Sequence, residues 1–222
     1  MRGRFITFEG GEGTGKSTHA TMLAQRLKSA GIDALLTREP GGSPGAEVIR
    51  HIILSGAAKP LGAEAETILF ASARDDHVRT TIRPALERGT WVLSDRFADS
   101  TRVYQGIVGE VDPRLIEGLE RITVGETKPD LTFILDVPAE VGLARALKRR
   151  GDAAADRFES EALEFHEKLR AAYRDLAARE SERCVLIDVT APHDQVAEKI
   201  WQVVDRRLRP SATAPNIGET AP

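Results

Sequence analysis

Four residues near the N-terminus have the types and the spacing of a phosphate-binding loop. Gly10, Gly15, Lys16 and Ser17 fit the pattern G-x-x-x-x-G-K-[ST] within the stretch FEGGEGTGKST. Glycines let successive backbone N–H groups turn toward an anion, and the start of a following helix adds a partial positive charge. A lysine here reaches the outer phosphates of a nucleoside triphosphate, and a serine hydroxyl can join the shell of Mg²⁺. The pattern predicts a triphosphate site with Ser17 at the metal.

Two arginines lie where strands of a parallel sheet are predicted to end. Arg38 closes one apolar run, and Arg96 follows Asp95 at the end of another. Ligands of open parallel sheets bind outside the carboxyl ends of the strands, so both guanidinium groups should face the crevice of the phosphate-binding loop. Because arginine holds phosphate oxygens in a bidentate manner, the pair favours a second, acceptor nucleotide. Asp95 is the preferred metal carboxylate, and Asp136, which also ends an apolar run, is expected to be structural.

The elements that must position these residues alternate along the chain. Short apolar runs predict strands at 4–9, 33–38, 91–95, 131–137 and 184–189. Amphipathic patterns predict helices at 17–30, 45–54, 64–87, 113–124, 139–149, 159–178 and 193–208. Pro84 can introduce a kink into the third of these helices. The alternation predicts an α/β fold in three layers, with a five-stranded parallel sheet covered by helices on both faces.

Composition limits the class of protein. The chain has 222 residues, of which 41% are hydrophobic, and this suits one domain over 1–208 followed by a Pro-rich tail at 209–222 that we expect to be disordered. A formal net charge of −3 argues against binding to nucleic acid or to an anionic membrane. No apolar run is long enough for a signal peptide or a membrane span, so we expect a cytoplasmic protein.

Several stretches together make the chain resemble the thymidylate kinases, in their bacterial form, within the P-loop nucleoside monophosphate kinases. In family order they are FEGGEGTGKST, TREPGG, FASARDDHV, SDRFADSTRVYQG, PDLTFILDV, RRGDAAADRFE and VLIDVTAP. The resemblance covers about residues 4–208. It implies ATP-dependent phosphorylation of dTMP to dTDP on a P-loop NTPase fold, with Mg²⁺ as cofactor, a helical lid at about 149–157 and a homodimer.

The resemblance also implies roles for individual residues. ATP binds at the loop and the start of the next helix, that is at Gly10, Gly11, Glu12, Gly13, Thr14, Gly15, Lys16, Ser17 and Thr18. The acceptor dTMP binds at Glu12, Arg38, Arg50, Phe70, Arg74, Arg96, Thr101, Tyr104 and Gln105. Within this set Phe70 stacks on the thymine ring and Tyr104 lies against the deoxyribose. Arg74, Thr101 and Gln105 read the base.

The implied catalytic set joins the loop, the third strand and the lid. Its members are Lys16, Asp95, Arg96, Arg149, Arg150 and Arg157. Ser17 and Asp95 are the implied metal ligands. The alanine run inside RRGDAAADR leaves open which of the three lid arginines contacts the transferred phosphoryl group.

Two other functions remain open at this point. Another deoxynucleotide or nucleoside kinase would share the phosphate-binding loop and the arginines. A P-loop regulatory module would bind nucleotide without an acceptor. The stretch TKPD at 127–130 has the letters of a guanine-recognition motif, but it precedes a strand instead of following one, so the guanine reading is disfavoured.

Overall fold

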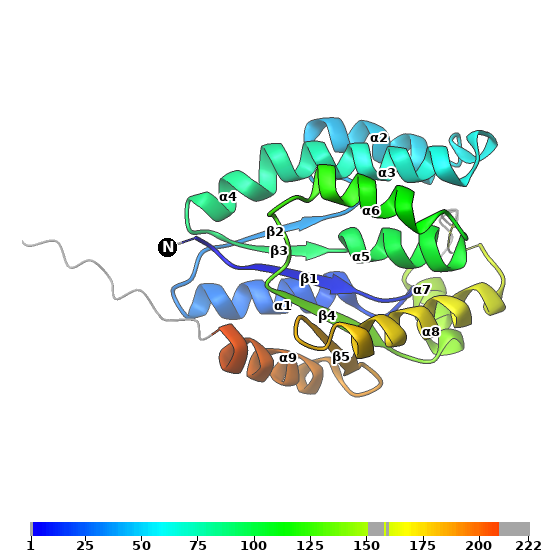
Figure 1. Cartoon of the computed structure of the whole chain (residues 1–222). Helices are drawn as coiled ribbons and strands as arrows, with labels where there is room; N and C mark the ends of the chain where they lie inside the picture. Colours follow the sequence, from blue (N-terminus) through cyan, green and yellow to red (C-terminus); the bar gives the residue numbers. More distant parts are fainter. Residues whose placement is uncertain (1, 151–157, 159, 209–222) are drawn as a thin grey trace, which may run out of the picture.

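Five apolar segments form one parallel sheet in the computed structural model, which describes residues 2–150, 158 and 160–208 (Figure 1). The strands are β1 (Phe5–Glu9), β2 (Ala34–Arg38), β3 (Trp91–Asp95), β4 (Leu131–Asp136) and β5 (Cys184–Asp188). Their order in the sheet is β2-β3-β1-β4-β5. All residues of the central strand β1 are buried, whereas the edge strand β2 is partly exposed. This arrangement confirms the predicted α/β fold with a five-stranded parallel sheet.

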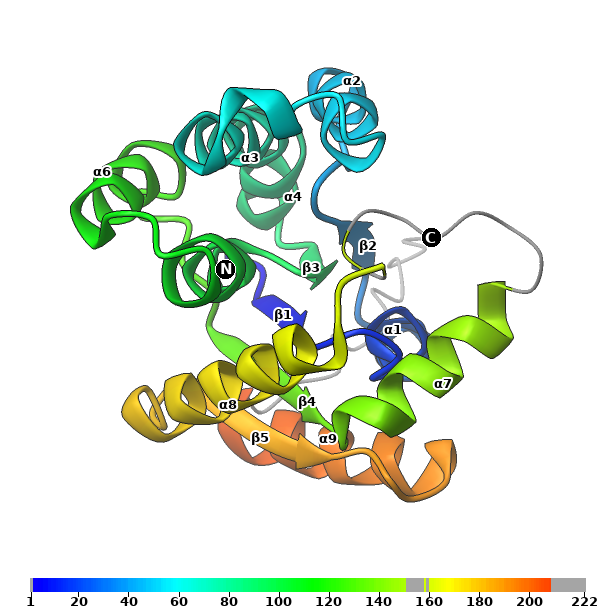
Figure 2. The same ribbon diagram turned by 90° about the vertical axis from the view of Figure 1, so that its right-hand side faces the viewer.

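Helices cover both faces of the sheet. The helices are α1 (Lys16–Ser29), α2 (Pro44–Leu54), the 3₁₀ turn η1 (Lys59–Leu61), α3 (Ala63–His77), the π-helical turn η2 (Val78–Ile82), α4 (Arg83–Glu87), α5 (Ala98–Thr101), the π-helical segment η3 (Arg102–Val108), α6 (Pro113–Thr123), α7 (Ala139–Arg150), α8 (Leu163–Arg179) and α9 (His193–Leu208). Figure 2 shows α1 and α9 on one side of the sheet and α4 and α8 on the other, and Ala98 of α5 packs in the same cluster as α4. None of the described helices could cross a membrane.

The side chains of β1 point alternately to the two faces of the sheet and contribute to a separate hydrophobic cluster on each face. Ile6 and Phe8 belong to the cluster that packs under α1 and α9. Phe5 belongs to the opposite cluster and meets Phe97 edge to face, with ring centroids 4.9 Å apart. Because successive side chains of a strand point to opposite faces, an unbroken apolar strand needs helices on both sides.

The predicted helix at 64–87 is continuous but not uniform. It runs through α3, η2 and α4, and the Arg83 N–H donates to the carbonyl of Val78, five residues back. A proline lacks the N–H and its ring clashes with the carbonyl four residues earlier. The wide turn directly precedes Pro84, so the helix passes this residue without ending.

The largest differences from the sequence prediction are a missed helical segment and the start of α8. The segment Ala98–Val108, which forms α5 and η3, was not predicted as helical. Its two pieces are short, and the π-helical segment breaks the 3.6-residue period on which the prediction depends. Helix α8 begins at Leu163 instead of residue 159, because Ala162 has an extended backbone with ψ 157°. The predicted tail at 209–222 and most of the predicted lid lie outside the described residues.

Candidate active site

A cleft of about 330 Å³ opens where β1, β2 and β3 end. This is a usual volume for a small-molecule site. The phosphate-binding loop and α1 contribute Glu12, Gly15, Lys16, Ser17 and Thr18 to its lining. The expected acceptor residues that line it, besides Glu12, are Arg38, Arg50, Phe70, Arg74, Arg96, Thr101, Tyr104 and Gln105. The fold therefore brings the complete predicted acceptor set and half of the loop to one cavity.

The loop itself needs glycine for its backbone and for its neighbours. Gly10, Gly13 and Gly15 have φ of 136°, 66° and 84°, values that side chains disfavour. A β-carbon on Gly13 would lie 1.9 Å from the carbonyl oxygen of Gly142 in α7. Gly10, Gly11, Gly13 and Thr14 form the part of the loop outside the cleft lining.

Lys16 lies along the inside of this loop. Its ammonium group donates to the carbonyl oxygens of Gly10 at 3.2 Å and Gly11 at 2.7 Å. Burial lowers the pKa of Lys16 to about 8 and nearby Arg96 adds to the effect, although Glu12 and Asp95 oppose it. Lys16 therefore remains largely a cation at neutral pH, as a phosphate-binding lysine requires.

Ser17 and Asp95 supply oxygen atoms at one point of the cleft. The Ser17 hydroxyl donates a hydrogen bond to the Asp95 carboxylate. Hydroxyl and carboxylate oxygens suit Mg²⁺, which keeps several waters and needs few protein ligands. Among residues 2–150, 158 and 160–208, no cluster of three or more His, Cys, Asp or Glu side chains could hold a metal. Asp136 lies elsewhere and is paired with Arg170 at 2.7 Å and Arg174 at 2.6 Å.

Arg96 and Glu12, which both line the cleft, form an ion pair. Arg96 has a left-handed backbone with φ 69°, and its Nη2 lies 2.5 Å from Glu12 Oε1. The Tyr104 hydroxyl donates to the same oxygen at 3.1 Å, and the guanidinium lies 4.9 Å from the centre of the Tyr104 ring. Burial opposes the charge on Glu12, but Arg96 and Lys16 outweigh it and lower the Glu12 pKa to about 2.

The other two predicted acceptor arginines come from β2 and α2. Arg38 ends β2 and donates to both carboxylate oxygens of Glu47, at 2.9 and 3.2 Å. Arg50 donates to the carbonyl oxygen of Pro40 at 2.5 Å. Both side chains line the cleft, so the three arginines Arg38, Arg50 and Arg96 approach it from three separate elements.

Arg74 is held rigidly on the side of the cleft where the base is expected. Its Nε donates to Glu39 Oε2 at 2.8 Å, and its Nη2 donates to Thr101 Oγ1 at 3.0 Å. The Glu39 carboxylate also lies 3.0 Å from Nδ1 of the fully buried His77. Phe70 lines the cleft near Phe158, with ring centroids 6.5 Å apart.

Sequence reasoning missed Glu39 and His77 as supports of Arg74. Glu39 directly follows the second strand inside TREPGG, and a carboxylate at a strand end was a usable signal. His77 gave no signal, because only the fold brings the end of α3 next to Thr37 of β2 and to Glu39.

The region predicted to form a lid is only partly described. Arg149 lines the cleft, and its charge contributes to the low pKa of Glu12. Arg150 is the last residue of α7 and is not among the described residues that line the cleft. Arg157, with the rest of 151–157, lies outside the described residues.

A parallel sheet with a phosphate-binding loop after its central strand, and a cationic cleft at the strand ends, defines a P-loop nucleotide-binding protein of the α/β class. The family model for thymidylate kinase matches residues 8–200. The chain belongs to the thymidylate kinase family.

Individual relatives agree with this assignment. The chain is 63% identical over 213 residues to a thymidylate kinase from Nitrobacter winogradskyi, covering 96% of this chain and 93% of that protein. It is 62% identical over 210 residues to a thymidylate kinase from Bradyrhizobium diazoefficiens, covering 95% and 92%. The crystal structure of thymidylate kinase from Ehrlichia chaffeensis superposes with a TM-score of 0.73 and 29% identity, covering 92% of this chain and 100% of that chain.

Proposed function

We propose that the cleft transfers the γ-phosphoryl group of ATP to dTMP, which gives ADP and dTDP. One observation carries the proposal: half of the phosphate-binding loop, including Lys16 and Ser17, lines the same cavity as the acceptor arginines. Two anions can therefore be held next to each other, the triphosphate by backbone N–H groups with Lys16 and the monophosphate by Arg38, Arg50 and Arg96. Family membership favours this reaction over another nucleoside kinase or a regulatory module.

The chemistry needs positioning and charge compensation more than proton transfer. The nucleophile is a phosphate oxygen of dTMP that is already ionised near neutral pH, so no strong general base is required. Lys16 and a lid arginine would neutralise the charge that develops on the transferred group. An arginine in that position contributes roughly 10³ to 10⁵ in rate. Arg149, which reaches the cleft, is the described lid residue best placed for this role, with Arg150 and Arg157 as the other members of the set.

Mg²⁺ fits the pair formed by Ser17 and Asp95. Their oxygens lie next to each other in the cleft, beside the loop that would hold the β- and γ-phosphates. Bound there, the ion would neutralise charge between those two phosphates. The two side chains would orient it, and Lys16 would complete the positive surface.

The thymine ring would lie between Phe70 and the fixed Arg74. Arg74 is already committed to Glu39 and Thr101, so its remaining N–H groups point in one defined direction. Tyr104, bound to Glu12, would lie against the deoxyribose. Recognition of one methyl group gives only about 1–3 kcal/mol, so dUMP should be a poor substrate without being excluded.

A coupled assay of ADP release tests the proposal. We expect turnover that requires dTMP, a kcat/KM for dUMP that is about 10- to 200-fold lower, and little turnover with dCMP or dAMP. The variant Lys16→Ala should lose most of kcat, because it removes the cation at the β- and γ-phosphates.

Two results would contradict the proposal. ADP release that does not depend on any monophosphate would indicate a regulatory or motor protein. A clear preference for dCMP or dAMP would indicate a different nucleotide kinase.

The oligomeric state and the location are part of the same proposal. We expect a cytoplasmic homodimer, with an interface supplied by the side of the molecule where α2, α3 and α6 lie next to each other (Figure 2). Exposed apolar side chains gather on these helices: Val48 and Ile52 on α2, Ile68 on α3 and Ile122 on α6.

A further inference from the structure

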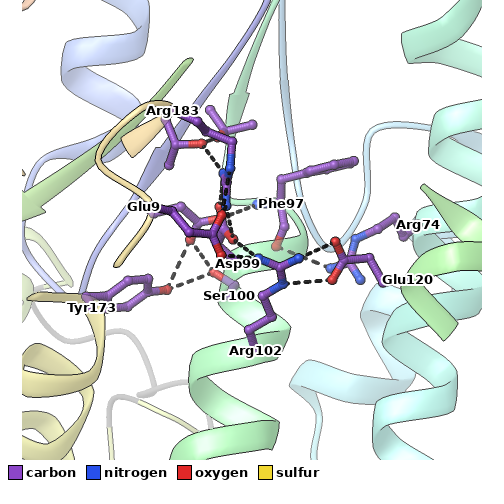
Figure 3. Close-up of polar contacts among 12 residues, drawn as sticks. Glu9, Arg74, Phe97, Asp99, Ser100, Arg102, Glu120, Tyr173 and Arg183 are labelled. Atoms are coloured by element: carbon purple, nitrogen blue, oxygen red, sulfur yellow. Dashed lines mark hydrogen bonds and ion pairs between the residues drawn. The ribbon is translucent and has the colours of Figure 1, made fainter. Parts of the chain in front are cut away.

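A buried carboxylate lies directly before the phosphate-binding loop and has no role in the mechanism above. Glu9 is the last residue of β1 and its side chain is fully buried. Its Oε1 accepts a hydrogen bond from the Phe97 N–H at 2.7 Å. Its Oε2 accepts from the Ser100 hydroxyl at 2.6 Å and from the Tyr173 hydroxyl at 3.0 Å. Figure 3 shows these three donors around Glu9: Phe97 directly before α5, Ser100 in α5 and Tyr173 in α8.

Two partners of Glu9 lie next to Arg96, which lines the cleft. Phe97 directly follows Arg96, whose left-handed backbone is unfavourable for a residue with a side chain. Ser100, which donates to Glu9, accepts from Arg96 Nη1 at 3.3 Å. Glu9 therefore holds both the backbone that follows Arg96 and the hydroxyl that contacts its guanidinium group.

The direction of these hydrogen bonds matters. The Phe97 N–H can only donate, so Glu9 Oε1 must accept. Because the Ser100 hydroxyl gives its proton to Oε2, its lone pairs face Arg96, which can only donate. An amide in place of the carboxylate has two possible orientations. In one, its NH₂ group faces the Phe97 N–H, so that two donors meet. In the other, its NH₂ group donates to Ser100, and the Ser100 hydroxyl proton then turns toward the Arg96 guanidinium group. Either arrangement leaves a buried donor without an acceptor.

The surroundings of Glu9 carry charges of both signs. Burial raises the pKa of Glu9 to about 7, and the nearby negative charge of Asp99 in α5 adds to this, whereas Arg96 opposes it. Asp99 is itself paired with Arg183, at 2.7 and 2.9 Å. The Glu9 carboxyl group and the Arg96 guanidinium group both contact the Ser100 hydroxyl.

We propose that Glu9 is a positioning residue for the acceptor site, holding Arg96 through the Phe97 N–H and the Ser100 hydroxyl so that the guanidinium group meets the acceptor phosphate. The inference rests on the proposed function only for the identity of that acceptor. On the donor side, Arg96 Nη1 also donates at 3.2 Å to the Gly10 carbonyl oxygen that Lys16 contacts, so the effect on ATP has to be measured beside the effect on dTMP.

Steady-state kinetics at about pH 8 separate positioning from a purely structural role. We expect Glu9→Gln and Ser100→Ala each to lower kcat/KM for dTMP by about tenfold or more, the effect of one lost hydrogen bond to a charged group. KM for ATP should stay within about twofold of the wild type. The double variant should show less than the product of the two single effects, because both changes break one chain of contacts.

Thr7→Val is the matched control. Thr7 lies two residues earlier on β1, is fully buried, and shares a hydrogen bond of 2.7 Å with Thr132. The variant loses a buried polar contact of the same strand but keeps the contacts that link Glu9 to Arg96 through Phe97 and Ser100. KM for dTMP should therefore not change. An equal rise in KM for ATP and dTMP in Glu9→Gln, or the same loss in Thr7→Val, would overturn the proposal.

A crystal structure of Glu9→Gln keeps this test separate from the proposed function. We expect the Arg96 guanidinium to leave hydrogen-bond distance of Ser100 and Glu12. If it stays on both, Glu9 does not position Arg96, whatever the activity. If the wild-type protein shows no dTMP-dependent turnover, the proposed function fails. The position of Arg96 in the Glu9→Gln crystal structure still decides whether Glu9 positions Arg96.

Discussion

His19 and His193 lie ring against ring beneath the phosphate-binding loop. Their ring centroids are 5.2 Å apart, and His193 Nδ1 lies 3.4 Å from His19 Nε2. His19 is almost fully buried in α1, and its Nδ1 has no hydrogen-bond partner among the described residues. Burial lowers the pKa of His19 from 6.5 to about 4, and the positive charges of His193 and Arg145 add to this. The folded protein therefore keeps His19 neutral.

A neutral buried histidine makes the fold sensitive to acid. In the unfolded chain His19 is protonated below about pH 6.5, whereas in the folded chain it is protonated only below about pH 4. The free energy of unfolding therefore falls as the pH decreases from about 6.5 to about 4. We expect urea midpoints at about pH 7.5 and about pH 5 to differ less in His19→Phe than in the wild type.

The control for this prediction is His51→Gln, at an exposed position of α2. It should leave the pH dependence of the wild type unchanged. An unchanged pH dependence in His19→Phe would show that His19 is not the group responsible.

Sequence reasoning at the residue scale worked where a motif and a strand end coincide. Lys16, Ser17, Asp95 and Arg96 were expected at one crevice because parallel strands deliver their carboxyl ends to the same edge, and they do line one cleft. Glu9 stood inside the quoted motif, yet its role depends on Phe97, Ser100 and Tyr173. Nothing in the sequence predicts that these three donors meet at one carboxylate.

At the scale of elements, the phosphate-binding loop lies directly on the first turns of α7. A β-carbon on Gly142 would lie 2.4 Å from the carbonyl oxygen of Glu12, and one on Gly13 would lie 1.9 Å from the carbonyl oxygen of Gly142. In both positions the added β-carbon would clash with a backbone atom, which cannot move aside as the end of a flexible side chain can. Helix α7, which ends at the predicted lid residues Arg149 and Arg150, therefore helps to set the position of the loop.

This contact predicts that Gly142→Ala weakens ATP binding. The added methyl group must push Glu12 and the loop away from α7, so we expect a higher Kd for ATP by calorimetry and a lower melting temperature. Gly118→Ala in α6 is the matched control, because the space around Gly118 is open. It should leave ATP binding unchanged and stabilise its helix by about 0.5–1 kcal/mol. Equal ATP affinity in both variants would rule out the coupling of loop and helix.

Element prediction succeeded for long periodic segments and failed for short irregular ones. The helix at 193–208 has the same bounds in the structure, since its apolar face repeats over four turns and Val196, Ile200 and Val204 are buried. Helix α5 with η3 was missed, although it carries Ser100, Thr101, Tyr104 and Gln105. Its π-helical geometry shifts the face on which side chains appear, so a 3.6-residue period could not detect it.

For the whole molecule, the helices α2, α3 and α6 carry four exposed large apolar side chains, Val48, Ile52, Ile68 and Ile122. Val48 is 65% exposed and Ile122 is 74% exposed. Apolar side chains that cluster on exposed helices commonly mark a protein–protein interface. A net charge of only −3 offers little repulsion between copies of the chain.

We therefore expect sedimentation equilibrium to give the mass of a dimer. Ile68→Lys on α3, where an apolar side chain is 46% exposed, should shift the protein toward monomer by placing a charge in the interface. Leu147→Lys on α7 replaces a leucine that is 57% exposed on another element and should leave the dimer intact. A monomeric wild type, or dissociation by Leu147→Lys alone, would contradict the proposed interface.

The number and the parallel direction of the strands could be predicted from the alternation of apolar runs and helices. Their order could not, because neighbouring strands in a sheet need not be neighbours in sequence. β1 pairs with β3, where Phe5 lies opposite Val92, and with β4, where Ile6 lies opposite Leu131. Only the three-dimensional structure reveals that the loop lies at the centre of the sheet.

The strand order has a consequence for synthesis on the ribosome. β1 and β2 are made first but are not hydrogen-bonded to each other, since β3 lies between them. Until residues 91–95 have left the exit tunnel, the nascent chain holds two apolar strands without a partner, and such segments bind chaperones and aggregate. Early termination before β3 should therefore yield insoluble peptide instead of a partly active fragment.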